Sequence, residues 1–177
     1  MYKSPTRRRL RLAATLALGL VLMAGTTAFA QQKALPIHIE SNDADLSQQE
    51  GVSTYTGNVV LTRGGLTLTG HRLVITRIND RGNVKAVLDG SPARLDKQPD
   101  REGDDVVTGN SSKIEYTNSN STVLLRGDAV VRRGGDEIHG QLIRHNVDTG
   151  RTQAERGSGS SERVRITIQP KNGDGQS

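Results

Sequence analysis

The chain has 177 residues, no cysteine, and only four aromatic side chains, three Tyr and one Phe. Its formal net charge is +5 at pH 7, but residues 1–30 hold five of the 24 basic residues and none of the 19 acidic ones, which leaves 19 of each elsewhere. A balanced chain with almost no aromatic platforms is not suited to nucleic acid, so we expect no such partner.

The first thirty residues have the three parts of a secretory signal. Four arginines between Arg7 and Arg11 precede an apolar run from Leu12 to Gly25. Ala28-Phe29-Ala30 then forms a cleavage site of the small-x-small type. Because the apolar run is too short to span a bilayer, we predict a signal peptide over residues 1–30 that is cleaved on export to the periplasm. An uncleaved anchor is the alternative.

From Ile37 onward, apolar and polar residues alternate with a period of two, beginning with Ile37 and Ile39 and ending at Val164–Ile168. This alternation is the pattern of β-strands that bury one face. Turn sequences separate the runs, among them Gly64-Gly65 and Asp89-Gly90-Ser91-Pro92. The sequence therefore predicts an all-β fold with antiparallel strands.

Three segments depart from the alternation. Asn42–Ser47 favours a helical turn, for which Ser41 or Asn42 is the candidate cap. Asp96–Asp105 is acidic and Thr149–Ser161 is rich in Gly and Ser, so both are predicted to be loops. We predict one domain over residues 31–169, followed by a flexible polar tail over residues 170–177.

A repeat runs through this domain. The stretch Gly57–Gly65 returns as Gly127–Gly135 at an offset of 70, and six of the fourteen positions from Gly57 to Gly70 are identical at that offset. Self-similarity at a constant offset indicates one supersecondary unit that is used twice. The sequence thus predicts an internal two-fold repeat.

Several motifs carry a resemblance to a known family. Pro36–Asn42 and Tyr55–Leu61 are similar to the opening of the periplasmic lipopolysaccharide-transport proteins, the LptA or OstA-like family. Asp89–Ala93 and Gly127-Asp128-Ala129 also fall where that family has them. The resemblance implies an open antiparallel β-jellyroll, a twisted V-shaped roll with an apolar interior.

The resemblance also implies a function. Family members bind lipopolysaccharide through the acyl chains of lipid A and form a head-to-tail bridge from the inner to the outer membrane. The expected partners are lipopolysaccharide, further copies of the chain, the bitopic LptC-like component of the inner-membrane export complex, and the N-terminal domain of the outer-membrane translocon. The alternatives from the residues alone are a periplasmic holdase for apolar outer-membrane clients and an envelope scaffold with a filled core.

Candidate site residues come from the family match and from the alternation. The candidate lipid-binding residues are Ile37, Ile39, Leu68, Ile75, Leu95 and Tyr116. Ile37 and Ile39 match the opening strand, and the positions of Leu95 and Tyr116 are equivalent to groove residues of the family. The alternative for all six is ordinary core.

Two bases, Arg77 and Lys85, are candidates for contact with lipid phosphates at the rim of the groove. The alternative is that both are solvated surface charges. We expect no enzyme, no catalytic residue, no metal and no cofactor, because the four histidines are scattered and no nucleophile or phosphate-loop motif is present.

Overall fold

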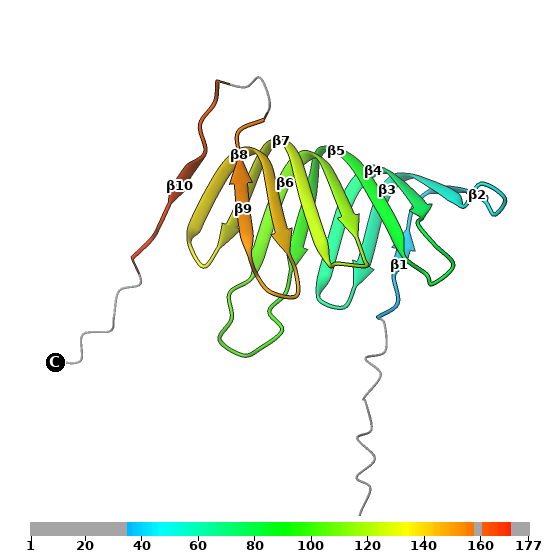
Figure 1. Ribbon diagram of the computed structural model, residues 1–177, viewed down its shortest axis with the longest axis horizontal. Coiled ribbons are helices and arrows are strands. Elements are labelled where there is room, and N and C mark those ends of the chain that lie inside the picture. Colours follow the sequence, from blue (N-terminus) through cyan, green and yellow to red (C-terminus); the bar gives the residue numbers. More distant parts are fainter. Residues whose placement is uncertain (1–34, 158–160, 171–177) are drawn as a thin grey trace, which may run out of the picture. The chain divides into compact units, whose positions relative to one another are not determined.

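The computed structural model describes residues 35–157 and 161–170, so the predicted signal peptide and residues 171–177 of the predicted tail lie outside the described residues. In the described part of the chain, no helix has the length and hydropathy needed to cross a membrane. The strands are β1 (His38–Glu40), β2 (Asp43–Ser47), β3 (Val52–Arg63), β4 (Leu66–Arg77), β5 (Val84–Lys97), β6 (Val107–Thr117), β7 (Thr122–Arg133), β8 (Asp136–Asn146), β9 (Thr152–Glu155) and β10 (Arg165–Thr167) (Figure 1).

These strands form one antiparallel sheet. The long strands β3 to β8 pair with their neighbours in chain order, so each hairpin adds the next strand. The two ends of the sheet carry short strands: β1 and β2 both pair with β3, and β9 and β10 both pair with β8 (Figure 1). The sheet is open, which confirms the predicted antiparallel jellyroll.

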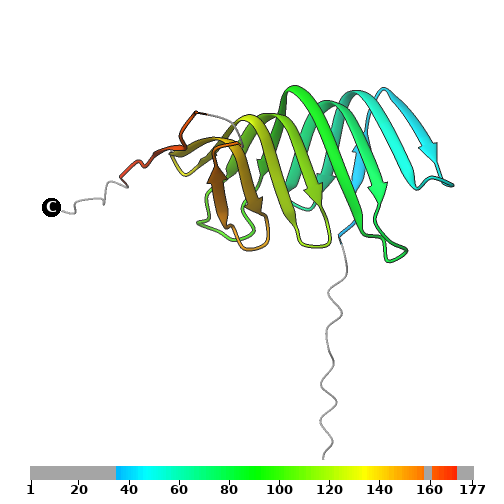
Figure 2. The ribbon, with the colours of Figure 1, turned by 45° about the horizontal axis from the view of Figure 1, so that its top comes forward.

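A crease divides each long strand in two. The register of every hairpin from β3 to β8 shifts near its middle, for example between Thr56 and Val59 and again between Arg126 and Ala129. Because a bulge bends its strand, bulges that are aligned across neighbouring strands fold the whole sheet (Figure 2). We call the resulting halves leaf A (residues 59–70, 93–110 and 129–140) and leaf B (residues 52–56, 72–89, 113–126 and 142–146).

The sequence repeat marks this crease. Gly57 and Gly127 have φ angles of 78° and 77°, and the following Asn58 and Asp128 both have a φ of 48°. Glycine adopts such left-handed backbone without steric cost, and Asn and Asp tolerate it better than other residues. The register also repeats at the offset of 70, since Val59 pairs with Gly70 as Ala129 pairs with Gly140. The predicted internal repeat is therefore confirmed as the β3–β4 and β7–β8 hairpins.

Three local predictions were wrong. Asn42–Ser47 is not a helical turn, because Asp43–Ser47 pairs along its whole length with β3. The predicted loop at residues 149–161 contains β9, which pairs with β8. In both cases the exposed edge of a long strand supplies backbone hydrogen bonds that local composition does not reveal. Asp89–Pro92 is not a turn between strands but the bulge inside β5.

Candidate functional site: the inner face and its mouth

The inner face of leaf A is a row of apolar residues. Ile39, Leu61, Leu68 and Leu95 are successive register partners across β1, β3, β4 and β5, and the row continues to the far edge through Gly109, Val131, Ile138 and Ile166. Residues opposite each other in antiparallel strands share a face. The structure therefore brings three of the predicted lipid-binding residues, Ile39, Leu68 and Leu95, into one row.

Leaf B presents a second row. Its register partners are Ser53, Ile75, Ala86, Tyr116, Val123, His145 and Thr152. This row contains two more of the predicted lipid-binding residues, Ile75 and Tyr116. The sixth, Ile37, precedes β1 and packs against the core from the edge of the sheet.

The two rows are packed against each other. Leu68 and Tyr116 are 0% exposed and Leu95 is 2% exposed, whereas Ile39 and Ile75 are partly buried. A Cβ atom added at Gly109 of leaf A would lie 2.9 Å from Leu125 Cδ2 of leaf B, so the leaves are in van der Waals contact. In this state Leu68, Leu95 and Tyr116 are core residues, and their contact with lipid remains a prediction.

The two predicted phosphate contacts lie on different faces. Arg77 is the last residue of β4, shares the face of Ile75 and is exposed. Lys85 is on the outer face, where its Nζ lies 2.8 Å from Glu115 Oε2. Partial burial raises the pKa of Glu115, but Lys85 and Arg126 outweigh that effect and hold the pKa below its ordinary value. Whether either base meets phosphate remains a prediction.

The free ends of the leaves form a mouth opposite the crease. Arg63, the last residue of β3, donates a hydrogen bond from Nη1 to the Tyr116 hydroxyl across this mouth, and its Cζ lies 5.9 Å from the centroid of the Tyr116 ring. Burial raises the pKa of Tyr116, although the Arg63 charge opposes the shift. The phenol is therefore neutral at physiological pH. It accepts the hydrogen bond of the Arg63 guanidinium but does not neutralise the guanidinium charge.

A cavity of about 250 Å³ lies at the mouth and is lined by both rims. Leaf A and its β5–β6 loop contribute Lys97, Asp100 and Arg133, and the other rim contributes His145 and the β8–β9 turn. Lys97 is only 8% exposed, and its Nζ donates to the Gln98 carbonyl at 2.6 Å and to Asp100 Oδ1 at 2.7 Å. These Lys97 contacts lie within one rim, whereas the hydrogen bond of Arg63 with Tyr116 crosses the mouth, and no strand pairing joins the two rims within the described residues.

His145 makes the stability of the fold sensitive to pH. It is 2% exposed, its Nδ1 lies 3.0 Å from Thr152 Oγ1, and burial lowers its pKa below 6.5, with smaller contributions from the Arg133 and Lys97 charges. Since the folded chain disfavours the protonated ring, the unfolded chain binds more protons, and stability present above about pH 6.5 is lost as the pH falls below that value.

We therefore expect the thermal unfolding midpoint of the wild type to fall between about pH 7.5 and pH 5.5, a range above that in which carboxylates titrate. His145→Gln keeps a polar group beside Thr152 but cannot be protonated, so its midpoint should be nearly constant over the same range. Differential scanning calorimetry of both proteins checks this. An equal decline in wild type and variant would contradict the assignment to His145.

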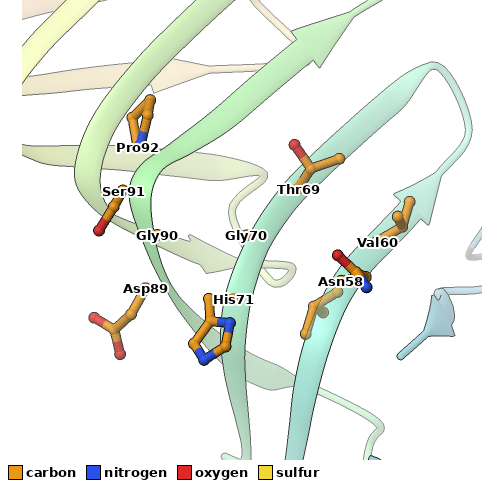
Figure 3. A pocket seen from close by; sticks show the side chains of 10 residues that line it. Asn58, Val60, Thr69, Gly70, His71, Asp89, Gly90, Ser91 and Pro92 are labelled. Atoms are coloured by element: carbon orange, nitrogen blue, oxygen red, sulfur yellow. The ribbon is translucent and has the colours of Figure 1, made fainter. Parts of the chain in front are cut away.

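Another hollow, of about 660 Å³, lies at the crease. Figure 3 shows that its lining comes from β3, β4 and β5 where these strands bend, with the side chains of Asn58, His71 and Asp89 at its border. Val60 and Thr69, which also line it, alternate with the buried Leu61 and Leu68 and so lie on the outer face. This hollow is separate from the inner face and contains none of the predicted site residues.

The part of the chain that the structure describes contains no candidate metal site. No group of three or more His, Asp or Glu residues there could hold a metal ion.

Sequence reasoning missed Arg63, Lys97 and His145 as residues of the mouth. A signal for the first was present, because the repeat aligns Arg63 with Arg133. The alternation also places Arg63, at the end of β3, on the same face as Val59 and Leu61. It likewise places Lys97 on the face of Ala93 and Leu95, and His145 on the face of Ile143. The burial of both side chains, however, arises from contact between the leaves.

Residues 38–151 match the family described as LptA/(LptD N-terminal domain) LPS transport protein. The chain belongs to this family. The match spans β1 to the turn after β8, and so includes both leaves and the mouth. The resemblance drawn from the motifs is thereby confirmed.

Individual members of the family are similar over most of their length. The lipopolysaccharide export system protein LptA of Escherichia coli K12 is 32% identical over 146 residues, which cover 80% of this chain and 77% of that protein. LptA of Haemophilus influenzae is 28% identical over 155 residues, covering 85% and 88%. The crystal structure of LptH, the LptA homologue of Pseudomonas aeruginosa, superposes with a TM-score of 0.70 at 28% identity and covers 77% of this chain and 96% of that one.

Proposed function

We propose that this chain binds lipopolysaccharide through the acyl chains of lipid A and carries it across the periplasm from the inner to the outer membrane. Membership of the family supports the transport role. The observation that carries the mode of binding is the inner face, where the apolar row of leaf A and the buried apolar residues of leaf B form one cluster inside a sheet that is open opposite its crease. Such a surface matches acyl chains in both chemistry and extent.

The energetics favour an apolar sheath for this cargo. Burial is worth about 0.8 kcal/mol per methylene, so exposing a chain of a dozen carbons to water costs roughly 10 kcal/mol. The leaves join covalently through the crease but are held at the mouth by side-chain contacts such as that of Arg63 with Tyr116. Parting them breaks no strand pairing, and entering acyl chains replace the apolar contacts that the leaves lose.

The edges of the sheet support a head-to-tail bridge. The apolar row of leaf A begins at Ile39 in β1 and ends at Ile166 in β10, which are opposite edges of the same sheet. Pairing β10 of one copy with β1 of the next continues the row from molecule to molecule by β-augmentation. This contact is heterologous and does not close, so it extends as a filament.

The same edges serve the two end partners in this proposal. One edge meets a bitopic LptC-like component of the inner-membrane export complex, and the other meets the N-terminal domain of the outer-membrane translocon. The family includes both LptA and the N-terminal domain of LptD. In this proposal the outer-membrane partner therefore has a related sheet, whose edge can pair in the same way.

Photo-crosslinking in living cells tests the proposal. A photoreactive amino acid at Ile39, on the inner face, is expected to give an adduct of lipopolysaccharide size. The same residue at His38, which is adjacent in β1 but exposed on the other face, is the matched control and should give none. A folded, exported protein that gives no adduct from either position would overturn the proposal.

The filled-core scaffold is the alternative that one observation favours, namely the complete burial of Leu68 and Tyr116. The two functions differ in what the purified protein carries. Co-purified lipopolysaccharide supports transport, whereas a lipid-free monomer that takes up none on incubation supports the scaffold. Binding of unfolded outer-membrane proteins instead of lipid would indicate the holdase.

A further inference from the structure

The last inward-facing residues of leaf A form a row that includes three bases. Arg63 pairs in register with Leu66, Leu66 with Lys97, Lys97 with Val107, and Val107 with Arg133. Register partners share a face, and Leu66, Lys97 and Val107 are all buried, so this face is the inner one. The bases are the final residues of β3, β5 and β7, which run in the same direction.

The spacing of the bases follows from the sheet. Adjacent strands lie about 4.8 Å apart, so bases on every second strand are separated by about 10 Å along the mouth. Leu66 and Val107 lie between them in the row, and the leaf A row lies below. Asp100, Asp104 and Asp105 of the β5–β6 loop line the cavity beside Lys97 and Arg133. An amphiphile with its chains in the interior would thus have its headgroup at the level of Arg63, Lys97 and Arg133.

The three bases differ in their surroundings. Arg63 has a phenol rather than a carboxylate as its hydrogen-bond partner, and its Nε is buried without a partner in the described part of the chain. Arg133 reaches over the mouth, where its Nη1 would lie 3.6 Å from a Cβ atom added at Gly150 on the opposite rim. Lys97 is occupied by Asp100 of the β5–β6 loop.

We propose that Arg63, Lys97 and Arg133 form an anion-binding row that binds the phosphate groups of the amphiphile in the interior. In the unliganded chain the Asp100 carboxylate is paired with Lys97, and a phosphate of the ligand displaces it. This inference rests on the proposed function. It assigns a role to the acidic loop, whose carboxylate is a built-in substitute for the ligand's anion. Phosphate accepts several charge-assisted hydrogen bonds at once, whereas Asp100 approaches Lys97 through one oxygen.

Acidic side chains next to the row restrict where a phosphate can bind. Asp136 continues the row on β8, but its Oδ1 accepts a hydrogen bond from the Gln169 backbone N–H at 3.0 Å. Asp148 lies on the opposite rim, near enough to Tyr116 to raise its pKa. A phosphate is therefore favoured along the three bases of leaf A and disfavoured at either of these carboxylates.

Binding of matched ligands to the purified protein tests the row. The probes are a bisphosphorylated lipid A, the same acylated sugar without phosphates, its deacylated bisphosphorylated counterpart, and inorganic phosphate. The wild type is expected to bind the phosphorylated lipid about tenfold more tightly than the dephosphorylated one. This preference should fall as salt rises.

Arg133→Met and Arg132→Met provide a matched pair. Both remove one positive charge from the same strand end, but Arg132 is on the outer face, where it pairs with Glu137. Arg133→Met should lose about fivefold in affinity for the phosphorylated lipid and nothing for the dephosphorylated one, and Arg132→Met should bind both as the wild type does. Arg63→Met should behave as Arg133→Met, with thermal unfolding measured for each variant.

Asp100→Asn gives a result that a folding defect cannot imitate. Freeing Lys97 is expected to raise the affinity for the phosphorylated lipid about threefold, whereas Asp104→Asn, an equal change of charge in the same loop, should alter it less. An unchanged or lower affinity of Asp100→Asn would overturn the role of the loop.

The remaining outcomes separate the inference from the proposed function. If the wild type binds neither lipid, the proposed function fails. If it binds both lipids equally, and Arg133→Met does too, the groove stands and the anion row is wrong. Tight binding of inorganic phosphate or of the deacylated probe would overturn the assignment to a lipid headgroup, whereas competition only at millimolar phosphate supports it.

Discussion

Replacing Leu68 by alanine is expected to lower the free energy of unfolding by about 3 kcal/mol. Leu68 is 0% exposed and lies in the middle of the leaf A row, so truncation leaves a cavity between two packed leaves. If Leu68 instead lined a water-filled groove in the lipid-free protein, the loss would be below about 1 kcal/mol, because the side chain would already meet solvent.

Urea denaturation of the lipid-free protein measures this difference, and Thr69→Ala is the matched control. Thr69 is the next residue of β4 and points to the outer face, where truncation should change the free energy of unfolding by less than about 0.5 kcal/mol. Equal, small effects for Leu68→Ala and Thr69→Ala would show that the leaves stand apart in solution.

The second large effect is expected at the edge of the sheet. Ile166 and Ile168 are large apolar side chains but are 59% and 71% exposed. β10 pairs with β8 on one side, and no strand of the described part of the chain pairs with its other side. If β10 pairs with β1 of a neighbouring copy, changing both residues to lysine removes apolar burial and places charge in the contact. The dissociation constant for self-association should rise at least about tenfold, because each lost buried side chain is worth 1 kcal/mol or more.

Sedimentation velocity over a range of concentrations measures this change. Ile78→Lys is the control, since Ile78 is 52% exposed but lies in the turn between β4 and β5, away from both edges. The double variant should remain monomeric where the wild type and Ile78→Lys form a series of oligomers. The same oligomers from all three proteins would exclude β10 from the contact.

Much of the fold could be predicted from local patterns. The alternation at Ile37 and Ile39 and at Val164–Ile168 predicted strands that the structure confirms as β1 and β10. The repeat of Gly57 at Gly127 predicted a duplicated unit, and the matching φ angles explain it, since both glycines make the same left-handed bend. The errors at Asn42–Ser47 and at Asp89–Pro92 arose because edge pairing and bulges depend on a neighbouring strand rather than on local residues.

The site was predictable only in part. The alternation and the family resemblance selected Ile39, Leu68 and Leu95, and the structure places them in one row. Neither source indicated that Lys97 and His145 are buried at the mouth, because each acquires its surroundings from a segment distant in the chain. The outer position of Lys85 agrees with the alternation of Val84, Ala86 and Leu88, whereas its ion pair with Glu115 depends on the register of β5 with β6.

The sequence by itself determined that the strands are antiparallel, two-faced and partly duplicated, because burying alternate apolar residues is a local requirement of a strand in water. It also indicated the family, through short motifs such as Pro36–Asn42 and Tyr55–Leu61 that can be read without the structure. Only the tertiary structure decided what covers the apolar face, where the sheet folds, and which charges meet at the mouth. The physical reason is that a period of two specifies which side of a strand avoids water, whereas the partner of that side depends on register and on bulges aligned across several strands.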